Sequence, residues 1–496
     1  MKKVDPLICA VQQKHIPPEP LRYVLEENCA ALKELQSVCQ DLVIHSFRLF
    51  NRYDAVLVFV EGMIDTNQCG LFVLEPLTEE KEESPENIKK HLHVGQTQTC
   101  TTIDMLISMV FNGHAAILAD NCNTATLIEL RSPVGRSISE PDMNRSVFGP
   151  RESFVEKVTL NTLLLRRKIH DSKLCMENFF VGRRGQAKLV LAYMGDITDP
   201  TIVADVKQKI QKIDVDAIGS IGQLTQYLQA QKSTPFAQIM PIERADLAAQ
   251  ALLEGRVVVF LDQNAQALVL PVVFWDFFRA ADDASEKPFT ATIMRYLRLL
   301  CFFASVLLPA WYVALMTWHP QLLPLKLALP LVQYTASIPL SITAEVLFIE
   351  ILLAILSEAA LRTPKQISQA IGLVGGVILG QALISSNLAT PPTLVIATAS
   401  VVAQFAMPHY SIVRTMAILR VAGIIAAAMY GLFGVSLLWF VLLCILAKMK
   451  TYDIPYLAPL GTYRWQDLKS LLFLRRAPQH KKRAAYIPVQ DTTRQV

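Results

Sequence analysis

The pattern of apolar and polar positions changes near residue 291. Before this point the apolar runs are short, and turn-forming residues interrupt them, which is typical of the strands and amphipathic helices of a soluble α/β domain. After it the apolar runs approach the roughly 20 residues that a membrane-spanning helix needs. The sequence therefore predicts an α/β soluble half followed by an all-α polytopic membrane half.

Five apolar segments are candidates for membrane spans. They are Tyr296–Trp318, Ile338–Leu361, Ile367–Ser385, Thr393–Met407 and Thr415–Ala447. As one helix, the last segment would extend about 50 Å, which exceeds the roughly 30 Å of the hydrocarbon core. Gly431 and Gly434 lie near its middle, so we divide it into two short spans. The prediction is six spans, with five as the alternative.

The soluble half contains an internal repeat. In each copy a helical stretch ends at a glycine, Gly113 or Gly255, and an apolar run, an Asp-containing turn and a second apolar run follow. This order predicts a helix with a glycine C-cap followed by a β-hairpin. We predict a duplicated α/β unit over about residues 40–132 and 173–273, with an amphipathic helix in 151–169 joining the copies.

These patterns divide the chain into four parts. We expect cytosolic α/β subdomains at 1–150 and 151–290, a transmembrane helical domain at 291–450 and a basic cytoplasmic tail at 451–496.

The distribution of charge supports this division. The whole chain has 496 residues, of which 52% are hydrophobic and 18% charged, with a net charge of +4. The part from Ala291 onward has 17 Lys and Arg but only 6 Asp and Glu, whereas the part before it has 30 and 37. The membrane half is thus basic and the soluble half acidic, as in a membrane protein with a large soluble domain.

Basic residues also orient the predicted spans. If the soluble half lies inside, the inside loops carry Arg362, Lys365, Arg414 and Arg420, and the tail follows Lys448. The positive-inside rule therefore places the soluble half and the C-terminus in the cytoplasm. The segment Met1–Pro20 has no apolar run after its lysines, so we expect no secretory signal peptide.

No enzymatic or cofactor-binding motif is present. The sequence has no phosphate-binding glycine loop, no dinucleotide-binding fingerprint and no nucleophile elbow, and its nine cysteines form no C-x-x-C pair. Asp120 and Asp262 occupy turns, where a structural role is expected. We therefore predict a protein that is not an enzyme and that holds neither a cofactor nor a metal.

Acidic residues within the apolar segments are the main candidate functional residues. Glu358 precedes Arg362 by four residues and can pair with it, whereas Glu345 and Glu350 have no basic residue near them in the sequence. A carboxylate in the hydrocarbon core is costly and normally faces an interior or a water path. The two glutamates either lie shallowly in a tilted or re-entrant segment or line a polar path.

Other polar residues in these segments recur at helical spacing. They are Gln381, Ser385, Thr393, Ser400 and Gln404. Individually such residues join neighbouring helices by hydrogen bonds, and together they are consistent with the lining of a pore. Gly372, Gly376 and Gly380 form a small-xxx-small pattern, which favours close helix packing either within one subunit or between subunits.

The tail carries a cluster of basic residues soon after the last apolar segment. They are Arg475, Arg476, Lys481, Lys482 and Arg483. A cytoplasmic polybasic stretch binds anionic lipid with about 1 kcal/mol per charge. We therefore expect membrane lipid as its partner and no nucleic acid.

Several longer motifs complete the sequence evidence. They are Gly149-Pro150-Arg151-Glu152-x-Phe154, Gly182-Arg183-Arg184, the run Ala251–Val257, Leu308-Pro309-Ala310-x-Tyr312, Gly375-Gly376-x3-Gly380-Gln381, Pro408-x-Tyr410-Ser411 and Pro455-Tyr456-Leu457-x-Pro459. On these motifs the chain resembles the A subunits of bacterial spore germinant receptors, the GerA family, over almost its whole length. It departs from the family pattern at Phe274–Lys287, at Pro391-Pro392 and in the loop His319–Pro339.

The resemblance implies a function that the residues alone do not. In that family the A subunit acts with a transporter-like B subunit and a lipoprotein C subunit in the spore inner membrane. It is thought to oligomerise into an ion channel whose opening starts germination. A close relative, stage V sporulation protein AF, has the same architecture and implies an amplifier of ion release as the alternative. A stand-alone secondary transporter is a further alternative, although the spans show no inverted repeat.

Overall fold

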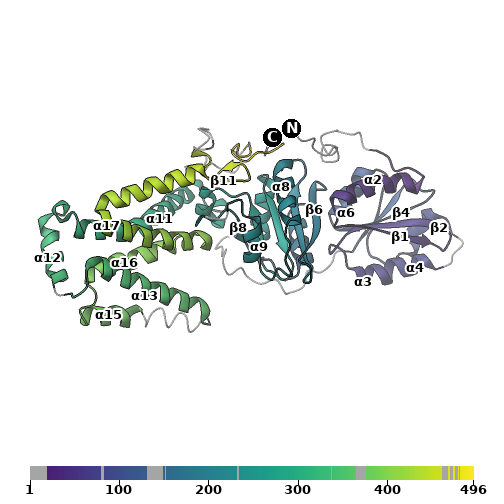
Figure 1. Cartoon of the computed structure of the whole chain (residues 1–496). Helices are drawn as coiled ribbons and strands as arrows, with labels where there is room; N and C mark the ends of the chain where they lie inside the picture. The colour runs from purple at the N-terminus through teal and green to yellow at the C-terminus, as the bar shows by residue number, and fades with distance from the viewer. Residues whose placement is uncertain are drawn as a thin grey trace. The chain divides into compact units, whose positions relative to one another are not determined.

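The structure is a computed structural model, shown in Figure 1. It describes residues 19–495 except 80–82, 131–148, 151, 232–233, 337, 365–375, 461–466, 468, 470–472, 475–478 and 480. The chain forms two compact units. Unit 1 consists of Met1–Ala230, Gln238–Val272 and Ala477–Val496, and unit 2 consists of Gln231–Ala237 and Val273–Arg476.

Unit 1 contains two five-stranded antiparallel sheets. The first comprises β1 (Leu42–Leu49), β2 (Tyr53–Val60), β3 (Thr97–Cys100), β4 (His114–Ala119) and β5 (Ala125–Glu129), in the order β1-β2-β4-β5-β3. The second comprises β6 (Leu174–Val181), β7 (Ala187–Met194), β8 (Met240–Ile242), β9 (Val257–Leu261) and β10 (Ala267–Leu270), in the order β6-β7-β9-β10-β8. The orders correspond strand by strand, as the predicted duplication requires.

Helices accompany both sheets. Those of the first repeat are α2 (Leu25–Val38), α3 (Thr66–Cys69), α4 (Glu75–Thr78), α5 (Ile88–His91) and α6 (Ile103–Phe111). Those of the second are α7 (Val158–Arg166), α8 (Pro200–Gln211), α9 (Ile221–Leu228) and α10 (Ala245–Leu253). Gly113 and Gly255, which follow α6 and α10, have φ values of 93° and 89°. The predicted glycine caps are confirmed, because left-handed backbone favours glycine at that position.

Each repeat begins with a helix that lies outside the residues predicted for the repeated unit. Asn28 in α2 and Asn161 in α7 each bind both backbone groups of the residue six positions earlier, Arg22 and Val155, at 2.6–3.0 Å. The helix predicted in 151–169 forms α7, which lies between the two sheets in the chain. It is the first element of the second copy, and α2 is its counterpart in the first. We call residues 19–130 repeat 1 and residues 152–272 repeat 2.

The two turn aspartates have the same structural role in the two repeats. Asp120 Oδ1 accepts a hydrogen bond from the first backbone N–H of α2, that of Leu25, at 3.2 Å. Asp262 Oδ1 accepts one from Val158, the first residue of α7, at 3.0 Å. Each carboxylate thus satisfies a free N–H at a helix N-terminus and complements the positive end of the helix dipole.

We expect Asp262→Ala to lower the free energy of unfolding of the chain by about 1 kcal/mol, because a helix N-terminus loses its capping carboxylate. Asp120→Ala should have a similar effect in repeat 1. Asp205→Ala is the control, since that side chain is exposed on α8. Chemical denaturation of the purified variants measures the difference. Equal stabilities of Asp262→Ala and Asp205→Ala would contradict the capping role.

Six cysteines of unit 1 that the structure describes are core residues. Cys29, Cys39, Cys69, Cys100, Cys122 and Cys175 are all buried and free. Burial raises the pKa of the Cys69 and Cys100 thiols to about 11. These two side chains therefore stay protonated near neutral pH and behave as small apolar groups.

Unit 2 is helical. Its helices are α11 (Pro288–Thr317), α12 (Leu325–Ala336), α13 (Ile342–Arg362), α15 (Gly376–Ser385), α16 (Pro391–Gln404) and α17 (Tyr410–Lys448). In Figure 1 helices α11, α13, α16 and α17 run alongside one another, and α12 lies at one end of the unit. A short hairpin of β11 (Lys450–Thr451) and β12 (Ile454–Pro455) follows α17.

The predicted five or six spans are not confirmed. Among the described residues, only α11 and α17 are long and apolar enough to cross a membrane, and α15 and α16 are shorter apolar helices. Helix α13 contains three glutamates and an arginine, and α16 has 14 residues, which extend only about 21 Å. The first part of the predicted span Ile367–Ser385 lies outside the described residues.

The last apolar segment is interrupted at Gly431, where the prediction divided it, although α17 counts as one candidate span. Gly431 interrupts α17 with φ 59° and ψ −141°, which are not helical values. A Cβ atom at this position would lie 2.9 Å from Trp318 Cβ. Both the left-handed backbone and the close approach of Trp318 therefore require glycine at the break.

Candidate functional site

A buried ion pair lies among the helices of unit 2. Glu350 on α13 and Arg420 on α17 approach to 2.9 Å between Oε2 and Nε, and their side chains are only 4% and 6% exposed. Such a pair is stable in an apolar environment only when the remaining polar atoms of both side chains also have partners.

Three neutral side chains from two further helices complete this site. Ser400 Oγ on α16 lies 3.3 Å from Glu350 Oε1. Arg420 donates to Ser305 Oγ on α11 at 3.2 Å and to Gln404 Oε1 on α16 at 3.3 Å. We call these five residues the polar layer. It joins four helices by side chains that come from distant parts of the sequence.

The position of Arg420 differs from the sequence-based expectation. That expectation placed Arg420 in an inside loop and left Glu350 without a basic partner. Instead, Arg420 lies within α17 and is buried. Its position inside a long apolar run was the signal that it needs a carboxylate partner.

The second buried glutamate caps a helix. Glu345 on α13 is 1% exposed, and its Oε1 accepts a hydrogen bond from the backbone N–H of Thr390 at 2.5 Å, directly before α16. The Thr390 and Thr393 hydroxyls lie 2.6 Å apart, and Tyr312 OH lies 3.0 Å from Thr393 Oγ1. The positive end of α16 therefore stabilises the Glu345 carboxylate.

The remaining predicted membrane residues do not join these clusters. Gln381 and Ser385 on α15 are exposed, and Ser385 Oγ donates to the backbone of its own helix. A Cβ on Gly380 would lie 3.3 Å from Leu394, whereas one on Gly376 would meet nothing within 4 Å. Gly372 lies outside the described residues. Of the glycine pattern, then, Gly380 packs within this chain and Gly376 faces open space.

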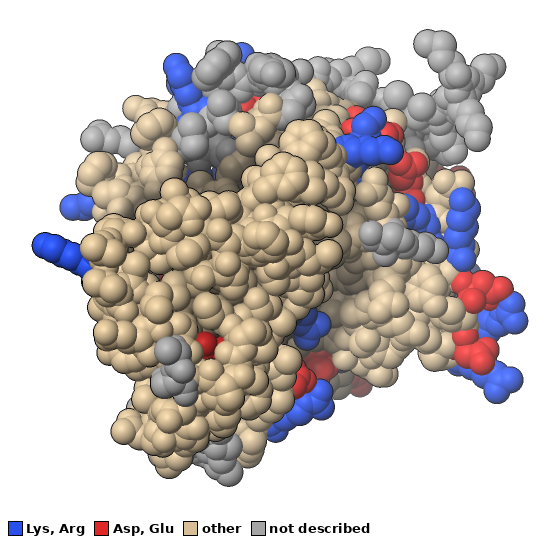
Figure 2. Space-filling model, turned by 60° about the vertical axis from the view of Figure 1, so that its left-hand side comes forward, with Lys and Arg blue, Asp and Glu red and all other residues tan. Residues whose placement is uncertain are grey.

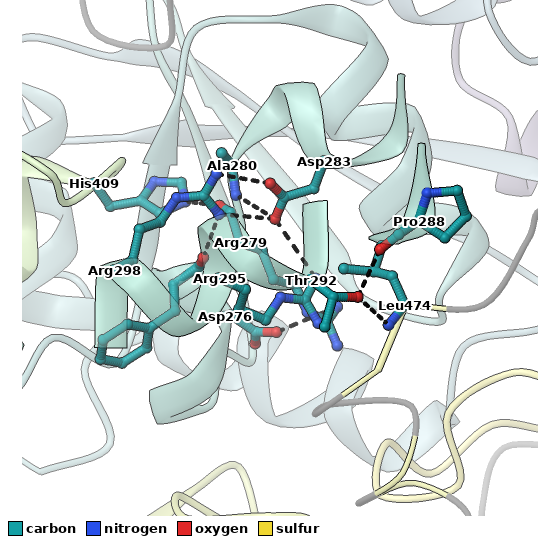
Figure 3. Close-up of polar contacts among 11 residues, drawn as sticks. Asp276, Arg279, Ala280, Asp283, Pro288, Thr292, Arg295, Arg298, His409 and Leu474 are labelled. Carbon is teal, nitrogen blue, oxygen red and sulfur yellow. Dashed lines mark hydrogen bonds and ion pairs between the residues drawn. The ribbon is translucent and has the colours of Figure 1, made fainter. Parts of the chain in front are cut away.

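A second charged cluster surrounds the start of α11 (Figure 3). Arg298 binds both carboxylate oxygens of Asp283, at 2.7 and 2.9 Å, and Arg295 approaches the same carboxylate at 3.5 Å. Asp283 also accepts from the Ala280 backbone N–H at 3.1 Å. This bidentate arrangement holds the segment before α11 against the first turns of the helix.

The same cluster extends to the chain before α17. His409 Nε2 lies 3.1 Å from the Arg279 backbone oxygen, and its ring packs edge-on against Phe277. Burial lowers the pKa of this imidazole, so it is neutral at pH 7. The starts of α11 and α17 are thus fixed to one segment, Phe274–Lys287, which departs from the family pattern noted above.

The predicted lipid-binding tail residues divide into three groups. Arg475 and Arg476 lie outside the described residues, and Lys481 and Lys482 are exposed. Arg483 is mostly enclosed, because it pairs with Asp491 at 2.7 Å and donates to the Leu253 backbone oxygen at 2.8 Å. The charges of Lys481 and Lys482 are therefore exposed, whereas the guanidinium of Arg483 is engaged within unit 1.

Acidic, histidine and cysteine side chains do not cluster in a way that suits a metal. Within the part of the chain that the structure describes, no group of three or more of these residues could hold a metal ion.

Comparison with known proteins relates the whole chain to one group. The family model described as Bacillus/Clostridium GerA spore germination protein matches residues 30–486. The chain is 29% identical to spore germination protein GerLA of Bacillus cereus over 91% of this chain and 93% of that protein. It is 29% identical to the uncharacterized membrane protein YfkQ of Bacillus subtilis, over 92% of this chain and 90% of that protein.

Two further proteins are also similar. Stage V sporulation protein AF of Bacillus subtilis is 28% identical over 88% of this chain and 90% of that protein. The crystal structure of the N-terminal domain of the A subunit of the Bacillus megaterium spore germinant receptor GerK3 covers 52% of this chain and 98% of that chain, with 25% identity and a TM-score of 0.40.

Proposed function

The chain belongs to the GerA family of Bacillus/Clostridium spore germination proteins, and we propose that it is the A subunit of a nutrient germinant receptor. In this proposal it acts with a transporter-like B subunit and a lipoprotein C subunit in the spore inner membrane. Its copies oligomerise around an ion path, and both unit 1 and the C-terminus lie in the cytoplasm.

The observation that carries the proposal is the polar layer within an apolar helical unit. The face of unit 2 seen in Figure 2 is largely uncharged. Large apolar side chains of unit 2 such as Ile351, Ile355, Val395 and Phe433 are more than half exposed. Such a surface suits lipid or another subunit, whereas a buried Glu–Arg pair inside it is costly. A membrane protein that retains such a pair is a candidate for charge or ion movement.

The geometry suggests how the polar layer acts. Glu350 and Arg420 neutralise each other, and Ser305, Ser400 and Gln404 surround them, so the resting arrangement offers no free charge to an ion. A shift of α17 against α13 would separate the pair and expose a carboxylate to water. We propose that this separation accompanies opening of the ion path.

The test compares two glutamates on the same helix. Glu350→Gln keeps the size of the side chain and removes its charge, whereas Glu358→Gln removes an exposed charge that pairs with Arg362 at 2.7 Å. We expect Glu350→Gln to change the nutrient-triggered release of cations from spores at least tenfold, and Glu358→Gln to change it less than twofold. Chain abundance in the spore membrane is measured in parallel.

Conductance of the purified chain with its B and C subunits in planar bilayers gives the direct reading. A conductance that is the same for the unaltered chain and for Glu350→Gln would contradict the role of the polar layer. No conductance under any condition would contradict the channel itself.

The similarity to stage V sporulation protein AF supports a second candidate, an amplifier of ion release. The two candidates differ in their partners. A receptor A subunit should be recovered from spore membranes together with B and C subunits, and its loss should abolish the response to one nutrient. An amplifier should be recovered without them, and its loss should slow the response to every nutrient.

A further inference from the structure

The C-terminal tail occupies a specific place on repeat 2. Residues 481–483 and 492–494 form a small hairpin, with a bridge between Lys482 and Thr493. The intervening segment continues onto the loop after β7, where Val489 forms an antiparallel bridge with Thr198. The Gln490 N–H donates to the Ile197 oxygen at 2.9 Å, and its side-chain amide donates to the Thr198 oxygen at 2.8 Å.

Apolar and charged contacts hold the same segment. Tyr486 and Ile487 are buried. A Cβ atom on Gly255, at the end of α10, would lie 2.4 Å from Val489 Cγ1, so the glycine leaves the space that the valine fills. Arg483 binds the Leu253 oxygen at the end of α10, together with Asp491 and the Thr493 oxygen. The contacts are those of an extended peptide bound to the loop after β7 and to the end of α10.

Comparison of the two repeats explains why this place is available. Ile64 in repeat 1 corresponds to Thr198 in repeat 2, because the next residues, Asp65 and Asp199, are the N-caps of α3 and α8. The Asp65 N–H donates to the oxygen of Leu130, the residue directly after β5, at 2.9 Å. In repeat 2 the chain leaves β10 for unit 2 instead, and the Thr198 position is paired with Val489 from the far end of the chain. The tail therefore takes the place that the chain itself fills in repeat 1.

We propose that repeat 2 carries a peptide-docking site and that residues 481–495 are its built-in ligand. Residues 273–476 of unit 2 lie in the chain between β10 and the tail. The start of this stretch continues directly from repeat 2. Its end is followed by the tail, which docks on repeat 2. The docked tail is a latch that follows the chain after α17. Release of the latch leaves the docking site on repeat 2 open.

The latch is tested with the full-length chain in detergent. Val489→Asp places a charge against Gly255 and Ile197 and should undock the tail, leaving the site open. A fluorescent synthetic peptide of residues 481–495 should then bind the Val489→Asp chain at concentrations up to about 1 mM, since a tethered tail competes at roughly that effective concentration. It should bind the unaltered chain at least tenfold more weakly, because the tail already occupies the site. A peptide that itself carries Val489→Asp is the control and should bind neither chain.

Every outcome decides the proposal. A peptide that binds neither chain shows that there is no docking site, and equal binding to both shows that the peptide contacts some other surface. Trypsin gives an independent reading, because cleavage after Lys481, Lys482 or Arg494 should be at least tenfold faster in Val489→Asp than in the unaltered chain. Equal cleavage rates overturn the docked position of the tail.

A cross-link tests whether the latch must open during the response to a nutrient. This experiment rests on the proposed function. Thr198→Cys with Val489→Cys places two thiols on a bridged pair, where Cβ atoms lie about 4.5–5.5 Å apart, near disulfide range. Oxidation by diamide, which takes up the two protons and two electrons, should slow nutrient-triggered cation release at least tenfold, and a reductant should restore it. Thr198→Cys with Thr493→Cys is the mismatched control. If the cross-linked chain responds normally, the latch does not open. A chain that responds neither before nor after oxidation contradicts the proposed function. In that case the peptide and trypsin results decide whether the tail docks.

Discussion

Replacing Arg420 by alanine is expected to lower the free energy of unfolding of unit 2 by about 3–5 kcal/mol. The substitution leaves the Glu350 carboxylate buried without its ion partner, and the cost of an unpaired buried charge exceeds that of the lost contact itself. Ser305 and Gln404 also lose the guanidinium that they bind. Thermal unfolding of the purified chain in detergent measures the effect.

Two further variants separate this mechanism from a general effect of the substitution. Arg414→Ala removes an exposed arginine from the same helix, where the guanidinium lies 5.0 Å from the Tyr410 ring, and should cost less than about 1 kcal/mol. Glu350→Met combined with Arg420→Met removes both charges and should recover most of the stability, because an apolar pair of similar volume is often neutral. If the double variant is as unstable as Arg420→Ala, burial of an unpaired charge is not the cause.

Replacing Arg166 by alanine is expected to have a comparable effect on unit 1. Arg166 on α7 binds both carboxylate oxygens of Asp41 in repeat 1, at 2.7 and 3.0 Å. Its remaining donors bind the backbone oxygens of Asp171 and Leu174, and its guanidinium lies 4.6 Å from the Phe111 ring. The side chain is 1% exposed, so its loss leaves Asp41 without a partner and a cavity between the repeats. We expect a loss of about 3–5 kcal/mol.

Arg167→Ala is the matched control, because that neighbouring side chain is exposed. It should change the free energy of unfolding by less than about 0.5 kcal/mol. Asp41→Asn combined with Arg166→Gln keeps hydrogen-bonding groups without charge and should be more stable than Arg166→Ala. Hydrogen exchange across β1 and β6 then shows whether the repeats separate. Unchanged exchange in Arg166→Ala would mean that this pair does not join them.

Much of the fold could be predicted because it depends on neighbouring residues. The change in apolar pattern near residue 291 separates the sheets of unit 1 from the helices of unit 2, and Gly113, Gly255 and Gly431 mark places where the backbone is left-handed. The duplication was visible in the hairpins but not in α2 and α7. Those helices correspond because Asn28 and Asn161 make the same hydrogen bonds in the two repeats, and not because their sequences contain an obvious run of similar residues.

The candidate site could be predicted only in part. Glu345, Glu350, Thr393, Ser400 and Gln404 were identified because polar residues stand out in apolar segments, and all five are buried. Their partners were not identified. Arg420 was assigned to a loop, and the Thr390 N–H that caps Glu345 carries no signal at all, since every residue except proline has one.

The sequence by itself determined that this protein has an acidic N-terminal part with an internal repeat, a basic and strongly apolar C-terminal part, and polar residues placed within apolar helices. Only the tertiary structure decided that Glu350 pairs with Arg420, that Asp41 pairs with Arg166 and that Val489 completes repeat 2. The physical reason is the distance along the sequence over which each property is decided. Burial periodicity and backbone conformation follow from a residue and its near neighbours. The partner of a buried charge or of an exposed loop backbone depends instead on how distant elements pack, which no local pattern records.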